Sequence, residues 1–319
     1  MELSLALAIQ AAQMVLVLAL SPLLTGFVRV VKARLVRRRG PPLLQSYRDL
    51  WRLLRKEVVL AENASWLFRT VPYLVFSATW VAAALVPTFA TGLMFSWTAD
   101  LIAIIALLGS ARFFLALAGM DVGTSFGGIG SSREVMIASI AEPAMLMIVF
   151  SLALLAGSTQ LSSMADYMLS SNVGLRVTLA LSLIALIMVG IAENARVPVD
   201  NPTTHLELTM VHEAMVLEYS RRHLAMVELA AALKLTMYLS LIACVYLPYG
   251  MARGVAAGGP ALLLGLVAYL GKLGLLGAML ALFEVTTAKM RVFRVGEFLG
   301  GALMLGFLAV LLLFVSRGM

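Results

Sequence analysis

Long apolar stretches alternate with short polar ones along the whole chain. A helix that crosses a bilayer needs about 20 mostly apolar residues, and eight stretches meet this requirement. The first has no basic region before it and is long enough to span, so we interpret it as a transmembrane helix and not as a cleaved signal peptide. The expected spans are Leu3–Val28, Val71–Ala90, Leu101–Gly119, Val135–Ala156, Leu175–Ala192, Ala225–Leu247, Ala261–Phe283 and Phe298–Val315. The pattern predicts an all-α integral membrane protein of about eight transmembrane helices, forming a single membrane domain over residues 1–319.

Lysine and arginine are unevenly distributed between the connections. Residues 29–69 alone hold eleven of the 24 cations, the other connections on that side add seven, and the opposite side has three. Because Lys and Arg are enriched in cytoplasmic loops, we predict that loops of about 29–69 and 193–224 are cytoplasmic. Both termini are then outside, in a multi-pass protein of the cell membrane.

The composition supports a lipid environment and narrows the redox chemistry. Hydrophobic residues make up 61% and charged residues 13% of the chain, against about 45–50% and 25% in soluble domains. The net charge of +7 follows from the loops and gives no reason to expect nucleic acid. The single cysteine, Cys244, cannot supply the four thiolates of an iron–sulfur cluster. Three histidines do not favour an internal array of haems. Electron transfer must therefore use cofactors on other chains, and we expect no metal or cofactor bound by this one.

The first basic loop predicts an amphipathic interfacial helix. Gly40, Pro41 and Pro42 force a turn, and apolar residues then recur at helical spacing. These are Leu43, Tyr47, Leu50, Trp51 and Leu54, with Arg48, Arg52, Arg55 and Lys56 mostly on other faces. Two interpretations are compatible: a helix lying on the lipid surface, or a docking platform for a cytoplasmic partner.

The second loop concentrates acids at the same side of the membrane. Asn201 can cap a new helix that has Pro202 at its first position. The acids of this region are Glu193, Asp200, Glu207, Glu213 and Glu218. They form either a solvated acidic loop or a polar cavity that leads protons into the membrane. A metal site at His205 and His212, with Glu213 nearby, is a weaker alternative because no third strong ligand is specified.

Residues 123–130 are rich in glycine. A phosphate-binding loop follows a strand, whereas a membrane span precedes this segment, so a nucleotide site is not expected. We predict a flexible or close-packed connection.

Ionisable residues inside the spans are costly and are candidates for function. They are Arg112, Glu142, Glu193, Glu228, Lys234, Lys272 and Glu284. All except Lys272, which is near mid-span, lie in the cytoplasmic half, which suggests a hydrated cavity that opens to the cytoplasm. Glu134 and Glu142 share a helix face and could pass protons through water. The alternative is static pairing, for example of Glu142 or Glu228 with Lys234.

At these residues the sequence resembles the respiratory complex I subunit 1 family. Within that family it is most similar to the membrane subunits of energy-converting (group 4) nickel–iron hydrogenases and formate hydrogenlyases, the hydrogenase-4 component C type. The motifs are Arg38-Arg39-Gly40-Pro41, Gln45-Ser46-Tyr47-Arg48-Asp49-Leu50, Ser132-Arg133-Glu134, Glu142-Pro143, Glu193-x-x-Arg196-x-Pro198-x-Asp200, Glu218-Tyr219-Ser220, Lys234, Lys272 and Phe283-Glu284. The resemblance covers nearly the whole chain.

The resemblance implies a non-catalytic anchor subunit of an oxidoreductase complex. It would dock a hydrophilic redox arm and couple electron transfer to proton or sodium translocation. The docking residues are Arg37, Arg38, Arg39, Arg48 and Asp49. The proton path is lined by Glu134, Glu142, Glu193, Asp200, Glu207, Glu213, Glu218, Glu228, Lys234, Lys272 and Glu284. The implied partners are hydrogenase large and small subunits and an iron–sulfur subunit, which carry a nickel–iron centre and the clusters, and antiporter-like membrane subunits within the lipid.

The sequence departs from the family pattern in the second loop. Thr203 and His205 occupy positions where the family often has acids, so only Glu207 is kept, and Arg221 replaces a glycine. These changes argue against the first rival function, a quinone-site subunit of a complex I-type NADH or ferredoxin dehydrogenase. The second rival is a stand-alone ion transporter, which is expected to show inverted repeats that the sequence lacks. A purely structural anchor is the third.

Overall fold

The computed structural model describes residues 2–61, 63–170, 177–199, 211–254, 258–288, 290 and 294–318. Almost all of the secondary structure is helical, as predicted. The elements are α1 (Glu2–Leu35), α2 (Gln45–Leu54), α3 (Trp66–Leu85), β1 (Ala90–Thr91), α4 (Leu101–Asp121), α5 (Ser125–Ala156), α6 (Leu161–Ser170), α7 (Val177–Glu193), α8 (His212–Val216), α9 (Arg221–Val245), β2 (Ala252–Arg253), α10 (Gly258–Thr286) and α11 (Val295–Gly318).

Seven of the described helices are long and apolar enough to cross a membrane: α1, α3, α4, α5, α9, α10 and α11. The eighth predicted span corresponds to α7, which is apolar but has 17 residues, and so measures about 26 Å against a hydrocarbon core of about 30 Å. The chain is therefore a multi-pass helical membrane protein, and about eight spans is a sound description of it.

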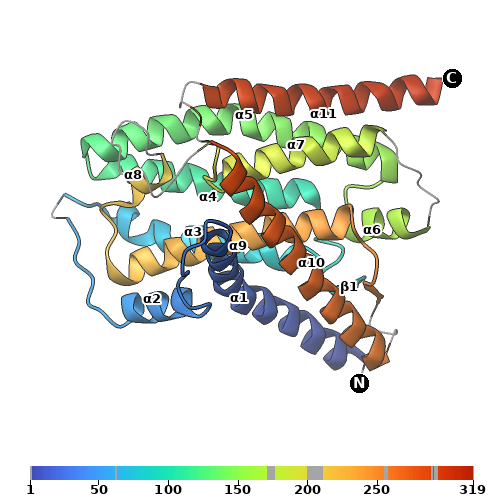
Figure 1. The fold of residues 1–319 in the computed structure, drawn as a ribbon, viewed down its shortest axis with the longest axis horizontal. Helices are drawn as coiled ribbons and strands as arrows, with labels where there is room; N and C mark the ends of the chain where they lie inside the picture. The colour runs from blue at the N-terminus through green and yellow to red at the C-terminus, as the bar shows by residue number, and fades with distance from the viewer. Residues whose placement is uncertain are drawn as a thin grey trace.

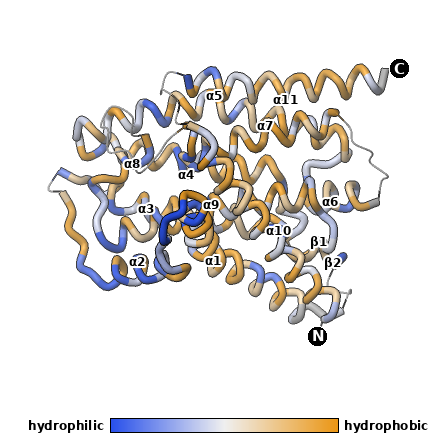
Figure 2. Tube along the Cα trace, viewed as in Figure 1, coloured by the Kyte–Doolittle hydropathy of each residue, from blue (hydrophilic) through white to orange (hydrophobic). Residues whose placement is uncertain are grey.

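The helices are arranged so that the charged connections gather at one end. In Figure 1, α2 and α8 lie at the left, whereas both termini, α6 and β1 lie at the right. We call the left end the basic end, since it carries the connection of residues 29–69. Blue hydrophilic stretches mark this end in Figure 2, while the spans are mainly orange. At the other end β1 and β2 pair in parallel, with Ala90 opposite Ala252.

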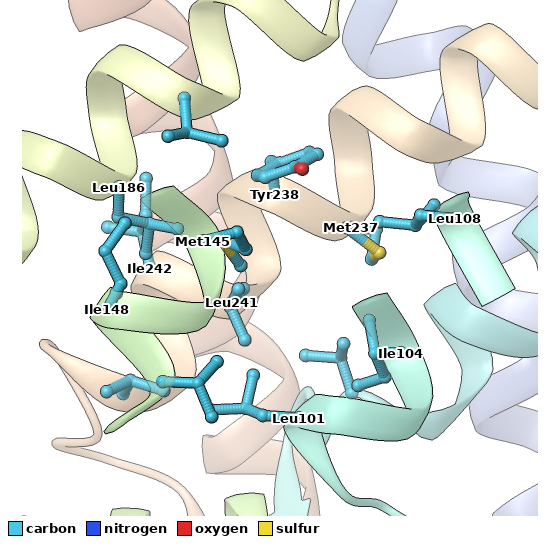
Figure 3. Close-up of a cluster of buried hydrophobic side chains, with 14 of the residues drawn as sticks. Leu101, Ile104, Leu108, Met145, Ile148, Leu186, Met237, Tyr238, Leu241 and Ile242 are labelled. Carbon is cyan, nitrogen blue, oxygen red and sulfur yellow. The ribbon is translucent and has the colours of Figure 1, made fainter. Parts of the chain in front are cut away.

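Helix α9 is the centre of the bundle. It contacts α1, α2, α3, α6, α7 and α10, and 72% of its span is buried, against 22% for α10. Figure 3 shows apolar side chains of α9 packed against α4, α5 and α7. They are Met237, Tyr238, Leu241 and Ile242 of α9, Leu101, Ile104 and Leu108 of α4, Met145 and Ile148 of α5, and Leu186 of α7. The core holds α9 in place, and α10 presents most of its surface to its surroundings.

The amphipathic helix of the first loop is present as α2, but its faces differ from the prediction. Trp51 and Leu54 are exposed together with Arg48, Arg52 and Arg55, and the guanidinium of Arg55 lies 4.4 Å from the Trp51 ring centroid. Because α2 packs on α1 and α9, the opposite face is turned toward the bundle, and the exposed face mixes aromatic and cationic groups.

The glycine-rich segment is helical, which corrects the prediction of a connection. Helix α5 begins at Ser125, ten residues before the expected start, and includes most of residues 123–130. The reason is close packing. A Cβ on Gly127 would overlap the carbonyl oxygen of Gly119 in α4, and one on Gly130 would lie 2.9 Å from the Val211 carbonyl oxygen. The glycines therefore let α5 approach α4 and the segment before α8.

Arg221, where the resemblance implies a glycine, has a left-handed backbone. Arg221 has φ of 58° at the start of α9, a conformation that costs a residue with a Cβ about 1–2 kcal/mol. A glycine would adopt this conformation without strain.

Alanine at Gly127 should disrupt the α4–α5 corner, and alanine at Gly128 should not. A methyl group on Gly127 meets backbone, whereas one on Gly128 meets nothing within 4 Å. We expect G127A to destabilise the protein by about 1–3 kcal/mol through overpacking and G128A to be neutral or stabilising by up to about 1 kcal/mol. The midpoint of thermal unfolding in one detergent checks both. Equal midpoints for the two variants would contradict the close packing.

Candidate functional site

Four helices bring charged side chains together around Arg112 of α4. The Arg112 side chain is 7% exposed. Its Nε lies 3.6 Å from Oε1 of Glu134, its Nη1 lies 3.9 Å from Oε1 of Glu142, and its Nη2 pairs with Glu193. On α9, Nζ of Lys234 lies 3.5 Å from Oε2 of Glu193. We call these five residues the Arg112 cluster.

Helix geometry explains why these groups meet. Glu134 and Glu142 are eight residues apart on α5, so they fall on one face, as expected from the sequence, and that face is turned to α4. Glu193 is the last residue of α7, where the chain leaves the helix at the basic end. A buried carboxylate is stable only when it is paired or hydrogen-bonded. The cations on α4 and α9 supply this pairing.

The carboxylates of the cluster differ in exposure. The side chain of Glu193 is 4% exposed, that of Glu134 is 12% exposed and that of Glu142 is 45% exposed. Glu193 contacts two cations, whereas Glu142 contacts Arg112 alone and at the longest distance. Glu193 is thus the central anion of the cluster, and Glu142 stands at its edge.

A cavity of about 60 Å³ adjoins the cluster. It is lined by Arg112, Glu134, Glu193 and Lys234, by Asn194, Ala195 and His212 at the basic end, and by Val75, Thr79, Leu108, Ala111, Leu115, Ala192, Val227, Ala230 and Ala231. This volume is large enough to hold ordered water. Within the described chain, Nη1 of Arg112, Oε2 of Glu193 and Oδ1 of Asn194 make no hydrogen bond. Water in the cavity can satisfy these buried polar atoms.

A second group of charges lies around Glu284 of α10. The Glu284 side chain is 1% exposed, and its carboxylate lies 2.5 Å from Nζ of Lys32 and 3.2 Å from Nη1 of Arg196. We call these three residues the Glu284 cluster. Glu193 and Arg196 are three residues apart, so one short segment joins the two clusters. In that segment Ala195 has φ of 47°, which turns the chain from one cluster to the other.

The other predicted path residues are not part of either cluster. Glu213, Glu218 and Glu228 are exposed, and Lys272 takes part in none of the ion pairs of the described residues. Asp200 and Glu207 lie outside the described residues, as does His205 of the alternative metal site. The alternative of static pairing named Glu142 or Glu228 as an example of a partner for Lys234, and that example is wrong, because Lys234 pairs with Glu193.

The predicted docking residues lie on the surface of the basic end. Arg37, Arg38, Arg39 and Arg48 are exposed. Asp49 is partly buried and accepts hydrogen bonds from Gln45 at 2.9 Å and from Arg52 at 3.1 Å, so it is already engaged within α2.

Three residues of these clusters are not among the site residues predicted from the sequence. Arg112 was recognised as a charge inside a span, but nothing in the sequence showed that three carboxylates share it. Arg196 and Lys32 were counted only as loop cations. The position of Arg196, three residues after Glu193, could have indicated that it belongs to the site. Lys32 and Glu284 are too far apart in the chain for any local pattern to connect them.

Neutralising Glu193 should cost far more stability than neutralising Glu142. E193Q leaves Arg112 and Lys234 without their shared anion in a buried site, which we expect to cost about 3–5 kcal/mol. E142Q removes one long contact at a half-exposed position, worth less than about 1 kcal/mol. Thermal unfolding midpoints of the two isosteric variants check the difference. Similar midpoints would show that Glu193 is not the central anion.

Comparisons with known proteins agree with this architecture. The sequence model of the NADH dehydrogenase family matches residues 7–315. Formate hydrogenlyase subunit 4 of Escherichia coli (strain K12) is 34% identical over 279 residues, covering 88% of this chain and 89% of the relative. Hydrogenase-4 component C of the same organism is 34% identical over 280 residues, covering 88% and 87%.

A solved structure shares the fold. It is described as the membrane-bound sulfane sulfur reductase, an archaeal respiratory membrane complex, and one of its chains aligns with a TM-score of 0.76 at 18% identity. The alignment covers 98% of this chain and 99% of that chain. The whole arrangement of helices is therefore shared, not only a part of it.

Proposed function

The chain belongs to the NADH dehydrogenase family, that of complex I subunit 1, and we propose that it is the membrane anchor of an energy-converting hydrogenase or formate hydrogenlyase-type complex. Two relatives that match nearly their full length carry these names. In this proposal the chain has no redox centre of its own. A nickel–iron centre and iron–sulfur clusters are carried by hydrogenase large and small subunits and an iron–sulfur subunit at the basic end, and antiporter-like subunits lie beside the chain in the membrane.

The basic end is the docking surface in this proposal. The exposed guanidinium groups of Arg37, Arg38, Arg39 and Arg48 give it a strong positive charge, which favours the approach of an acidic protein surface. Because Asp49 is bound within α2, its role is to hold the helix and its arginines in place. The positive-inside distribution supports a cytoplasmic position for this end.

The charge balance of the Arg112 cluster supports coupling to proton movement. Its three carboxylates and two cations sum to −1 when all are ionised. One proton therefore neutralises the cluster, and the adjacent cavity connects it to the segment at the basic end. Two cations would need only two carboxylates for a static network. The third, half-exposed Glu142, is the group placed to exchange a proton with a neighbouring carrier.

The observation that carries the proposal is that three carboxylates share Arg112 beside a cavity large enough for water inside the membrane bundle. Charges inside a membrane segment are expensive, and they are retained mainly where ions or protons move. A purely structural anchor has no need of an unneutralised carboxylate at this depth. Proton or sodium movement coupled to partner redox chemistry gives it a use.

Purification through a tag on this chain tests the redox partner. In mild detergent we expect the eluate to contain iron–sulfur subunits and nickel and to evolve hydrogen from a reduced donor. Metal analysis, subunit identification by mass spectrometry and hydrogen measurement check this. Iron–sulfur subunits without nickel, with quinone reductase activity, would move the complex to the rival family branch. A chain that elutes alone and still transports ions would overturn the anchor role.

Replacing Glu142 by Gln tests coupling. Because Glu142 is half exposed and contributes little to stability, we expect E142Q complexes to assemble and keep their electron-transfer rate while losing ion transport into liposomes. Transport is measured with a pH-sensitive dye, and with labelled sodium in parallel. E297Q is the matched control, since Glu297 is exposed at the start of α11. Unchanged transport in E142Q would refute the path, and loss of subunits from E142Q would indicate a structural role instead.

A further inference from the structure

Lys272 is a charge inside the membrane that has no ion-pair partner among the described residues. It lies 14 residues from either end of α10, about 21 Å along the helix in both directions. The centre of a bilayer is about 15 Å from the edge of its hydrocarbon core. Even a tilted helix therefore leaves this ammonium beyond the distance that a lysine side chain can bridge to reach the headgroups.

The described surroundings of Lys272 do not neutralise it. Helix α10 packs against α1, α9 and β2, and the thiol of Cys244 on α9 lies near Lys272. A neutral thiol is a weak acceptor. Asp166 of α6 interacts electrostatically with Cys244, but none of the ion pairs among the described residues joins it to Lys272.

The side of α10 that carries Lys272 is open. Leu275 and Met279, three and seven residues further along the same face, are each 59% exposed. Gly271, one residue before the lysine, borders this open face, and a Cβ there would meet nothing within 4 Å. A small residue at such a border lets another membrane helix approach closely. The face thus has both room for a helix and a charge that needs one.

We propose that Lys272 and the exposed face of α10 bind a helix of another membrane subunit, and that this helix carries an Asp or Glu at the depth of Lys272. The hydrocarbon core of the lipid offers no anion there. A second copy of this chain would bring another lysine to the contact, which repels. The inference rests on the proposed function only in that the chain has neighbours within the membrane, and it requires no proton movement.

A hydrophobic carbodiimide tests the contact in the native complex. Dicyclohexylcarbodiimide joins a carboxylate to an amine that touches it, forming an amide while the reagent takes up the water. We expect mass spectrometry to find the Lys272 peptide linked to an Asp- or Glu-containing peptide of another membrane chain, and K272Q to lose this link. A link to Asp166 or to another group of this chain would overturn the proposal. So would an unlinked Lys272 in a sample where other subunits become joined.

Recovery of the partner provides a second readout. Removal of one member of a buried charge pair weakens binding strongly, so K272M should lower the linked chain recovered per tagged chain by about tenfold. K272R keeps the charge and should retain that chain, and R253M removes an exposed cation in β2, at the end opposite the docking surface, as a control. Equal recovery with K272M would refute the contact. If the tagged wild-type chain elutes alone, the proposed function fails together with this inference, whereas a complex without the Lys272 link refutes the inference only.

Discussion

The structure depends on one buried guanidinium, that of Arg112. Unpaired, such a charge inside a membrane bundle is too costly to keep, and its partners come from three other places in the sequence. Glu134 and Glu142 fix the rotation of α5 toward α4, and Glu193 fixes the end of α7. Lys234 extends the same network to α9, the most buried helix. The cavity, the exit of the chain from α7 and the packing of the four helices all follow from satisfying this charge.

The two clusters have opposite net charge and are joined by a single short segment. Two cations and one carboxylate give the Glu284 cluster a net charge of +1, against −1 for the Arg112 cluster. Ala195 between them has a left-handed backbone, which costs about 1–2 kcal/mol and persists only where the surroundings dictate it. Glu193 and Arg196, held on either side, supply that constraint. In the proposed coupling, protonation of the Arg112 cluster would remove its net charge and so alter the electrostatic force on this strained segment, which leads to the loop at the basic end.

Hydropathy was sufficient to predict the spans, because a helix that crosses the hydrocarbon core must consist mostly of apolar residues. It failed at the start of α5, where glycine content suggested a connection. There, close contact with Gly119 and Val211 outweighs the low helix propensity of glycine. The acids of the site were identified individually from their position in apolar helices. Their partners were not, since Lys32 and Glu284 come from the first and the tenth helix, and only the packing of α1 on α10 brings them together. Lys234 pairs with Glu193 because of how the helices are rotated about their axes. Hydropathy does not indicate this rotation in spans that are apolar on all sides.

The charges within the membrane fall into two groups according to whether the chain neutralises them itself. Arg112, Lys234 and Glu284 have their counter-ions on other helices of the same chain, so their contribution to folding is complete without a partner. Lys272 has none among the described residues, and it lies on the least buried span, beside a glycine that leaves open space. The hydrocarbon core of a bilayer supplies neither water nor ions to these charges, so the missing counter-charge of Lys272 must come from another protein. The distribution of paired and unpaired charge therefore separates the part of the chain that is finished on folding from the part that is completed by assembly.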